Sequence, residues 1–203
     1  NNGLKPKLRR KKHPKKPDDE KRPETRVKNI LAALCPIRAN VVWAGDFTYI
    51  WIGGRFWYIA TVIDIYTREI VGWHIANHHT TALIMNAFAD ALERRNTVPQ
   101  YFHSDQGSEY TSGQYETSLK NCSVQPSHSQ KASPWQNGYQ ESFYSQFKLE
   151  LGNPKQFTHI GEFIAAVHQQ IHYYNNKRIH GTLKMPPAIF YKQKNTASAV
   201  LQY

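Results

Sequence analysis

Apolar and aromatic runs dominate the chain from residue 41 to about residue 76. The run DFTYIWI is followed by Gly53 and Gly54, a pair that tolerates the positive φ angles of a tight hairpin turn. Two more β-rich runs, RFWYIATVIDIYT and EIVGWHIA, follow after short turns. Three such runs joined by tight turns predict an antiparallel meander of three strands.

A helical period replaces this pattern after residue 80. Thr80 or Thr81 is expected to cap a helix, because apolar residues then recur at spacings of three and four. These apolar positions are Ile84, Ala87, Phe88, Ala91 and Leu92. QYFHSD indicates a short buried strand, reached by a crossover and therefore expected to run parallel to the first strand. A second helix is predicted from about Ser112, and SVQPSHSQKA indicates another short strand that leads into a loop.

The stretch SPWQ at residues 133–136 predicts the start of a third helix. It places Ser as N-cap, Pro at the first helical position and Gln at the third, which is a capping-box pattern. This helix is expected to continue to about Leu151 and to end at Gly152.

A last helix is predicted from roughly Ile160 to Asn175. One face of it is apolar and carries Ile160, Phe163, Ile164, Val167 and Ile171. The tail beyond, with Pro186 and Pro187, has few periodic features. The order β-β-β-α-β-α-β-α-α is that of an α/β fold of the ribonuclease-H-like type, with a mixed five-stranded sheet flanked by helices.

Charge distinguishes the first residues from the rest of the chain. The 203 residues are enough for one ordinary domain with appendages, and their formal net charge is +11. Residues 1–28 hold twelve Lys and Arg against four Asp and Glu, with almost no apolar side chains, so they cannot fold alone. Such a basic arm favours a polyanion through counterion release, and the alternative is a solubilising tail.

A short apolar patch follows the basic arm in VKNILAALCPIRA. It centres on Ile30, Leu31 and Leu34 and is stopped by Pro36, so we expect one or two helical turns that dock on the body. Cys35 and Cys122 stand alone, which predicts no disulfide framework. No run approaches the ~20 apolar residues of a membrane span, and no apolar signal region is present, so a reduced intracellular compartment is expected.

Three carboxylates stand where a metal site can be assembled. Asp46 lies in the first apolar strand, Asp105 ends the short QYFHSD strand, and Glu141 lies in the third helix. Two carboxylates 4 Å apart repel by about 1 kcal/mol in water and about 4 kcal/mol at an effective dielectric of 20. Divalent cations reverse that sign, and carboxylate oxygens suit Mg²⁺ or Mn²⁺. Two such ions can activate a water or a 3′-hydroxyl and stabilise the leaving oxygen, which indicates phosphoryl transfer.

Other polar residues compete for a role in this site. We interpret Asp64 as a turn or strand-end residue, and Glu109 and Glu116 as a solvated helix start. Glu150 is expected to be a surface partner for a lysine. His103 shares the face of Asp105, and it either orients a phosphate or is a packed, hydrogen-bonded histidine.

Four motifs resemble the integrase catalytic core of bacterial insertion-sequence transposases, which is related to retroviral integrases. They are WAGDFTYI, FHSDQGSEYTS, SPWQNGYQESFYSQFKLE and YNNKRIHGTLKMPP, and the resemblance runs from about residue 41 to 192. It implies a DDE triad of Asp46, Asp105 and Glu141 that holds two Mg²⁺ or Mn²⁺ ions. By analogy, Asp46 bridges both ions. The resemblance also implies a basic residue two helical turns beyond the Glu, which Lys148 matches.

The helix of Glu141 is also expected to contact DNA. Ser145 and Lys148 lie four and seven residues after Glu141 and therefore share its face. The basic arm adds Arg9, Arg10, Lys11 and Lys12. Arg178 and His180 match the family's C-terminal motif, and either touch DNA or brace the last helix.

The resemblance implies three parts. Residues 1–40 form a basic linker and the end of an upstream DNA-binding region, residues 41–175 the integrase core, and residues 176–203 a tail that completes it. The expected partners are DNA, both element ends and target, further copies of the chain on that DNA, and a separate DNA-binding protein from an upstream reading frame. The expected location is the bacterial cytoplasm, at the nucleoid.

Three functions fit these patterns. The first is an active transposase core that cuts element ends and joins them to target DNA. The second is a catalytically silent remnant that acts by occupying DNA. The third is a structure-selective nuclease of the same fold, although such enzymes usually carry four clustered acids where this chain has three and a lysine.

Overall fold

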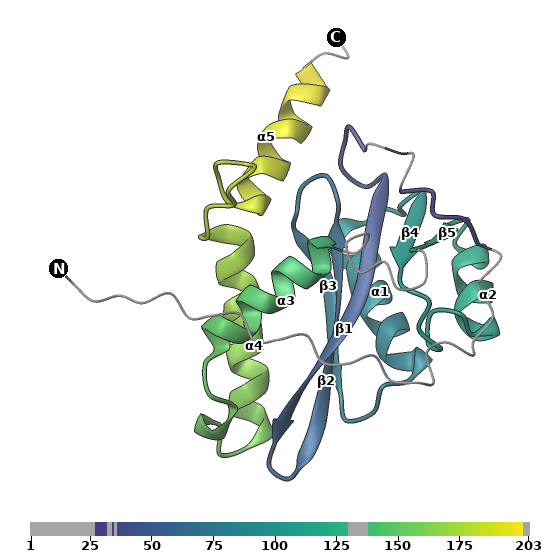
Figure 1. Ribbon diagram of the computed structural model, residues 1–203. Coiled ribbons are helices and arrows are strands. Elements are labelled where there is room, and N and C mark those ends of the chain that lie inside the picture. The colour runs from purple at the N-terminus through teal and green to yellow at the C-terminus, as the bar shows by residue number, and fades with distance from the viewer. Residues whose placement is uncertain (1–26, 32–33, 35, 130–137, 201–203) are drawn as a thin grey trace.

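The structure is a computed structural model that describes residues 27–31, 34, 36–129 and 138–200, with side chains to residue 196. One five-stranded sheet forms its centre, with the strand order β3-β2-β1-β4-β5 (Figure 1). The strands are β1 (Val42–Ile52), β2 (Arg55–Asp64), β3 (Ile70–Ala76), β4 (Tyr101–Ser104) and β5 (Gln125–His128). β1, β2 and β3 pair antiparallel, whereas β4 pairs parallel with β1 and with β5. The predicted meander and the predicted parallel strand are therefore confirmed.

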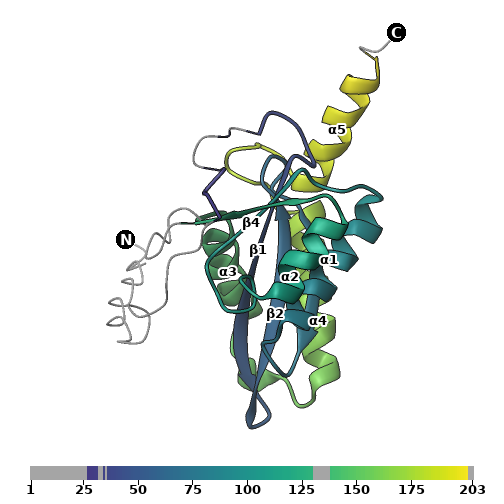
Figure 2. The ribbon, with the colours of Figure 1, turned by 90° about the vertical axis from the view of Figure 1, so that its right-hand side faces the viewer.

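Helices cover both faces of the sheet (Figures 1 and 2). These are α1 (Thr81–Arg95) and α2 (Gly113–Asn121) on one face, and α3 (Gly138–Leu151) and α4 (Ile160–Asn176) on the other. A fifth helix, α5 (Pro187–Val200), packs against α4 and extends away from the sheet (Figure 1). Alternation along β1 divides the interior, because Val42 and Ala44 pack with α3 and α4 while Trp43 packs with α1 and α2. The result is a three-layer α/β domain with an apolar core on each side of the sheet.

One close approach brings α1 against β3. A Cβ on Gly72 would lie 2.4 Å from the main-chain oxygen of Ala87 and 2.5 Å from the main-chain nitrogen of Ala91. Both neighbours are backbone atoms, so only a residue without a side chain lets this helix pack so near the sheet.

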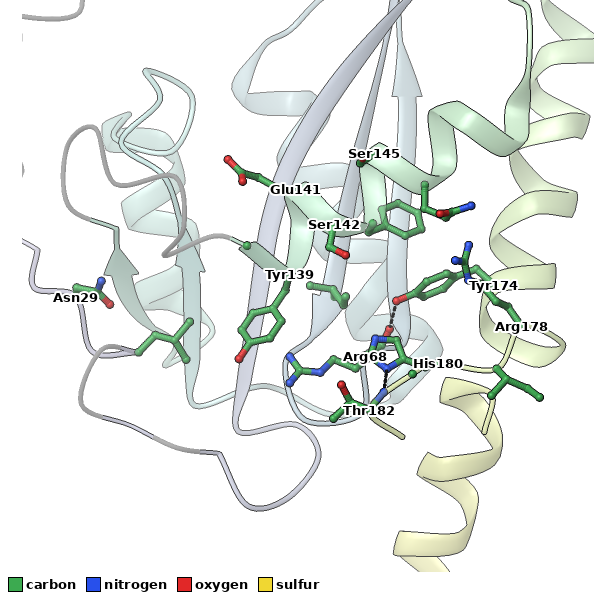
Figure 3. A pocket seen from close by; sticks show the side chains of 17 residues that line it. Asn29, Arg68, Tyr139, Glu141, Ser142, Ser145, Tyr174, Arg178, His180 and Thr182 are labelled. Atoms are coloured by element: carbon green, nitrogen blue, oxygen red, sulfur yellow. Dashed lines mark hydrogen bonds between the residues drawn. The ribbon is translucent and has the colours of Figure 1, made fainter. Parts of the chain in front are cut away.

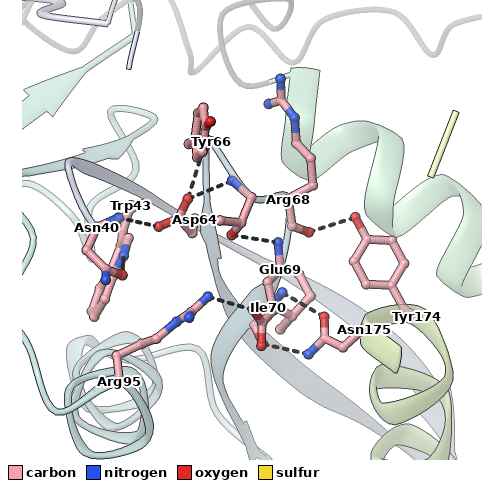
Figure 4. A network of polar contacts seen from close by, with 11 residues as sticks. Asn40, Trp43, Asp64, Tyr66, Arg68, Glu69, Ile70, Arg95, Tyr174 and Asn175 are labelled. Carbon is pink, nitrogen blue, oxygen red and sulfur yellow. Dashed lines mark hydrogen bonds and ion pairs between the residues drawn. The ribbon is translucent and has the colours of Figure 1, made fainter. Parts of the chain in front are cut away.

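Polar contacts hold the turn between β2 and β3 (Figure 4). The buried carboxylate of Asp64 accepts hydrogen bonds from the main-chain N–H groups of Asn40, Tyr66 and Thr67, at 2.6, 2.9 and 2.8 Å. The Asn175 side chain pairs with both the N–H and the carbonyl of Ile70, each at 2.9 Å. Asp64 is thus a turn residue, as the sequence predicted.

The segment before β1 docks on the body, as expected. Leu31 and Leu34 pack against the core that contains α3 and α4, and the Leu34 N–H reaches the Ile30 carbonyl at 3.1 Å. The SPWQ stretch and Cys35 lie outside the described residues.

Two expectations about helices were wrong. Ile164 is 41% exposed rather than buried, whereas Phe163, Val167 and Ile171 do form the core face of α4. The helix at Ile160 is also not the last, since α5 begins at Pro187. Proline suits the first turn of a helix, because the first N–H groups have no partner within it. Across the residues described, no helix is both long enough and apolar enough to cross a membrane.

Candidate active site

The sheet brings Asp46 and Asp105 to the same place. Ala44 of β1 pairs with His103 of β4, and each acid lies two residues beyond its member of that pair. The two strands run parallel, so equal offsets carry both carboxylates to one end of the β1–β4 pair. β4 ends at Ser104 whereas β1 continues to Ile52, so Asp46 lies on β1 just beyond the part of the strand that pairs with β4.

A buried polar network fixes α3, and hence Glu141, above this point. The Gln140 side-chain amide donates to the Ala44 carbonyl at 2.7 Å, and the Tyr144 hydroxyl donates to the Asp46 carbonyl at 2.8 Å. Thr61, which pairs with Asp46 across β1 and β2, has its hydroxyl 3.0 Å from Gln140 Oε1 and 2.8 Å from Tyr144 OH. Gln140 and Tyr144 flank Glu141 on the helix, so they set its position over β1.

The acids influence one another electrostatically. Burial raises the pKa of Asp46 to about 7, and the negative charges of Asp105 and Glu141 add to that rise. The Phe47 N–H, which donates to Asp46 Oδ1 at 2.8 Å, and the Lys148 ammonium oppose it. The other two carboxylates of the predicted triad are therefore within electrostatic range of Asp46.

The pKa of Asp105 is raised for similar reasons. Burial is the main cause, and Glu109 adds to it, while the Gly107 N–H donates to Asp105 Oδ1 at 2.9 Å and opposes the rise. A divalent cation would relieve the repulsion at both aspartates.

The donor chemistry of this site suits a hard divalent cation. All three candidate ligands offer carboxylate oxygens, and the negative charges of Asp105 and Glu141 add to the burial that raises the pKa of Asp46. Among the described residues, however, no three acids, histidines or cysteines stand close enough to form a ready-made metal site. Ligation by all three would need Glu141 and the aspartates to draw together.

Lys148 lies within electrostatic range of one of the three acids, Asp46, and its Nζ is 5.5 Å from the centre of the Tyr49 ring. Burial lowers the pKa of Lys148, while Asp46 favours its charged form.

A cavity of about 1250 Å³ adjoins α3 on the side of Glu141 and Ser145 (Figure 3). Arg68, Tyr139 and His180 also line it, and the Arg68 guanidinium lies 3.8 Å from the centre of the Tyr139 ring. One wall of the cavity therefore carries the positive charge of Arg68, and Glu141 lines the same cavity.

Arg178 lines the same cavity and also braces the fold. Its guanidinium forms an ion pair with Glu150, so α3 is tied to the segment that follows α4. The partner of Glu150 is an arginine, and the expected lysine was wrong. Burial lowers the pKa of His180, and the positive charges of Arg68 and Arg178 lower it further.

Glu109 was wrongly expected to be solvated. It is 9% exposed, and its Oε1 lies 2.7 Å from Nδ1 of His79. It also lies close to Asp105, because a Cβ on Gly107 would contact carboxylate oxygens of both. Glu116, by contrast, is exposed in the first turn of α2, as predicted.

His103 is a packed residue. It is fully buried, and its Nδ1 lies 2.9 Å from the Ser127 hydroxyl, which also accepts from the Ile30 N–H. Of the two interpretations of His103, the structure supports the hydrogen-bonded one. Arg9, Arg10, Lys11 and Lys12 lie outside the described residues.

The sheet order, the helices on both faces and the acids at the end of the β1–β4 pair define a ribonuclease-H-like domain. Two family models, both described as integrase core domain, match residues 36–134 and 122–187. The chain belongs to the integrase core family, among the transposases of insertion sequences.

Curated relatives carry that name. The transposase for insertion sequence element IS904 of Lactococcus lactis is 36% identical over 159 residues, which is 77% of this chain and 62% of the relative. The transposase InsK for IS150 of Escherichia coli, a putative one by its name, is 30% identical over 77% of this chain and 56% of its own length. The chain thus spans about half to three fifths of these relatives.

Solved structures share the fold at low identity. The HTLV-2 integrase catalytic core domain in complex with magnesium superposes with a TM-score of 0.56 at 14% identity, over 76% of this chain and 98% of that one. The catalytic core domain of BIV integrase gives 0.58 at 18% identity, over 79% and 99%. These similarities establish the fold alone.

Proposed function

We propose that this chain is the catalytic core of a DDE transposase, which cuts DNA at the ends of an element and joins the freed 3′ ends to target DNA. The observation that carries the proposal is the equal offset of Asp46 and Asp105 beyond the Ala44–His103 pair, with Glu141 held above by Gln140 and Tyr144. Relatives named as transposases support it.

Asp46, Asp105 and Glu141 would hold two Mg²⁺ or Mn²⁺ ions, with Asp46 shared between them. When bound, these ions supply activation of a water or 3′-hydroxyl and stabilisation of the leaving oxygen. The HTLV-2 structure in complex with magnesium supports the choice of metal. The chain itself supplies carboxylates from β1, from the residue after β4 and from α3, which is hydrogen-bonded to β1, so the acids and the bound ions together would position the scissile phosphate and no covalent nucleophile is needed.

The DNA path in this proposal follows α3. Ser145 and Lys148 share the Glu141 face, and Lys148 is an exposed cation within electrostatic range of Asp46, which favours a contact with a phosphate near the bond that is cut. Arg178, on the cavity wall, and the basic residues Arg9, Arg10, Lys11 and Lys12 would add phosphate contacts. We assign residues 41–175 to the catalytic core, residues 1–40 to a basic linker and the end of an upstream DNA-binding region, and residues 176–203 to a C-terminal tail that completes the core.

Concerted joining of two ends needs two active sites, so we expect at least a dimer on DNA. Recognition of the element ends would come from the region upstream of the core, in the same protein or in a separate one.

Substitution of Glu141 tests the function. Glu141→Gln should abolish joining of a pre-cut end to target DNA in Mg²⁺ or Mn²⁺, while DNA affinity stays within a few-fold. Glu116→Gln, an exposed glutamate in α2, is the matched control and should join normally. Equal joining by Glu141→Gln and the unaltered protein would remove Glu141 from the mechanism.

One observation favours a second function, a structure-selective nuclease. Glu109 places a fourth acid near Asp105, as such nucleases usually require. Its bond to His79 opposes this, because that contact already engages the carboxylate. Hydrolysis of an RNA–DNA hybrid that is lost in Glu109→Gln, without any strand joining, would favour the nuclease.

A further inference from the structure

Large aromatic side chains are exposed along the β1–β2 hairpin. Tyr49, Trp51 and Phe56 are 56%, 55% and 42% exposed. Tyr49 pairs with Tyr58 and Trp51 with Phe56 across the two strands, so all four rings lie on one face of the hairpin. We call Phe47, Tyr49, Trp51, Phe56 and Tyr58 the aromatic ladder.

Neighbouring rings of the ladder are in contact. The ring centres of Trp51 and Phe56 are 4.6 Å apart, those of Tyr49 and Phe56 5.2 Å, and those of Tyr49 and Tyr58 6.1 Å. The first two pairs meet edge to face, at interplanar angles of 75° and 81°. The outer rings belong to neither apolar core, since Tyr49, Trp51 and Phe56 are absent from both. Exposed apolar side chains that contact one another in this way indicate a surface that binds another molecule.

The inner end of the ladder reaches the acids through His79. The ring of His79 lies 5.0 Å from Tyr58 and 6.1 Å from Phe47, almost parallel to the latter. Nδ1 of the same His79 contacts Glu109, which stands beside Asp105. The ladder is thus continuous with the candidate active site.

A cation, the side chain of Lys148, lies near both the aromatic ladder and Asp46. Lys148 lies over the Tyr49 ring and within electrostatic range of Asp46. The surface next to the acids therefore offers aromatic faces and a positive charge together, on a chain whose net charge is +11. Aromatic platforms with an adjacent cation bind single-stranded nucleic acid, because every base has a face that can stack while the cation meets the phosphates.

We propose that the aromatic ladder stacks unpaired bases of the DNA strand that leaves the active site. This inference rests on the proposed function, because it specifies that the DNA bound beside the candidate active site is single-stranded. A single strand is the occupant rather than a second copy of the chain, since the ladder runs into the acids at one end and carries Lys148 at its margin.

The test compares two fluorescein-labelled oligonucleotides of equal length and charge, one of thymidines and one with abasic positions, by anisotropy in EDTA. The unaltered protein should bind the thymidine strand more tightly. Replacing both Tyr49 and Trp51 by Ala should weaken that binding about tenfold or more, while abasic binding changes less than about twofold, because only base stacking is lost. Tyr49→Phe with Trp51→Phe should restore the preference.

Tyr173→Ala is the matched control, since this tyrosine is 49% exposed on α4 and should leave the preference unchanged. The proposal would be overturned if the unaltered protein bound the thymidine and abasic strands equally well. It would also be overturned if the double-alanine variant kept the preference for the thymidine strand. A change in sedimentation with unchanged base binding would instead make the surface a contact between copies.

The two proposals fail separately. If the unaltered protein prefers the thymidine strand but neither cuts nor joins DNA with metal, base stacking by the aromatic ladder is supported and the proposed transposase function is contradicted. If cutting is intact and the double-alanine variant binds the thymidine strand normally, only the ladder falls.

Discussion

The Tyr144 hydroxyl donates a hydrogen bond to the main-chain carbonyl of Asp46, at 2.8 Å. One acid of the triad is thereby tied through its own backbone to the helix that carries another. Tyr144 is one turn beyond Glu141, so a shift of either element changes the separation of the two carboxylates.

Tyr144→Phe should therefore affect activity more than stability. Removing the hydroxyl takes away its bonds to the Asp46 and Ile59 carbonyls and to the Thr61 hydroxyl, and we expect a loss of about 2 kcal/mol of unfolding free energy, since the ring still fills its site. Metal-dependent joining should fall about tenfold or more, because Glu141 loses its fixed position. Urea unfolding and a joining assay measure both, with exposed Tyr173→Phe as the control. Unaltered joining would mean that this contact only supports the fold.

The pKa of Asp46 predicts how stability depends on pH without metal. Its pKa in the folded protein, about 7, exceeds the ordinary value of 3.8, so the folded state binds the proton more tightly than the unfolded state. Stability contributed by the protonated acid is complete below about pH 4 and is lost as the pH rises to about 7. The loss is about 4 kcal/mol at most.

Urea unfolding in EDTA between pH 4 and pH 8 measures this effect. Asp46→Asn cannot ionise, so its stability should decline less over the same interval. Parallel pH profiles for the two proteins would contradict the raised pKa.

Asp64 should be structural, in contrast to the triad. Asp64→Ala removes the acceptor of three main-chain N–H groups, and we expect a loss of about 3 kcal/mol or more in unfolding free energy. Exposed Glu116→Ala should change stability by about 0.5 kcal/mol or less. Chemical denaturation checks both, and a stable Asp64→Ala protein that no longer cuts DNA would instead place Asp64 in the site.

Gly72→Ala should destabilise the packing of α1 on the sheet. The added carbon would overlap backbone atoms of α1, which cannot turn away, so we expect a loss of about 3 kcal/mol. Gly113→Ala meets no atom within 4 Å and should be neutral. Melting temperatures compare the two, and equal values would show that α1 can move outwards at little cost.

The strands, and the approach of Asp46 to Asp105, could be predicted from the sequence because both depend on local pattern and on parallel register. Asp46 and Asp105 each follow a recognisable strand, so their meeting required only the topology. Gln140 and Tyr144 could not be predicted, since their partners lie about 80 to 100 residues away and any surface helix carries such residues.

Two misses have physical causes. Glu109 follows a Gly-Ser turn that is typical of solvated loops, and only its pairing with His79, thirty residues earlier, buries it. The prolines at Pro186 and Pro187 indicated a tail, although Pro187 occupies the first position of α5.

The central claim is that the three acids form a working metal-dependent site for DNA strand transfer. The most direct measurement incubates a branched DNA that mimics the joined product with Mg²⁺ or Mn²⁺, beside an Asp105→Asn variant. Resolving a branch needs the acids but little recognition of the element ends. We expect metal-dependent resolution that is absent in Asp105→Asn. No resolution by the unaltered protein, with tight and salt-sensitive DNA binding retained, would contradict the account and favour a protein that only occupies DNA.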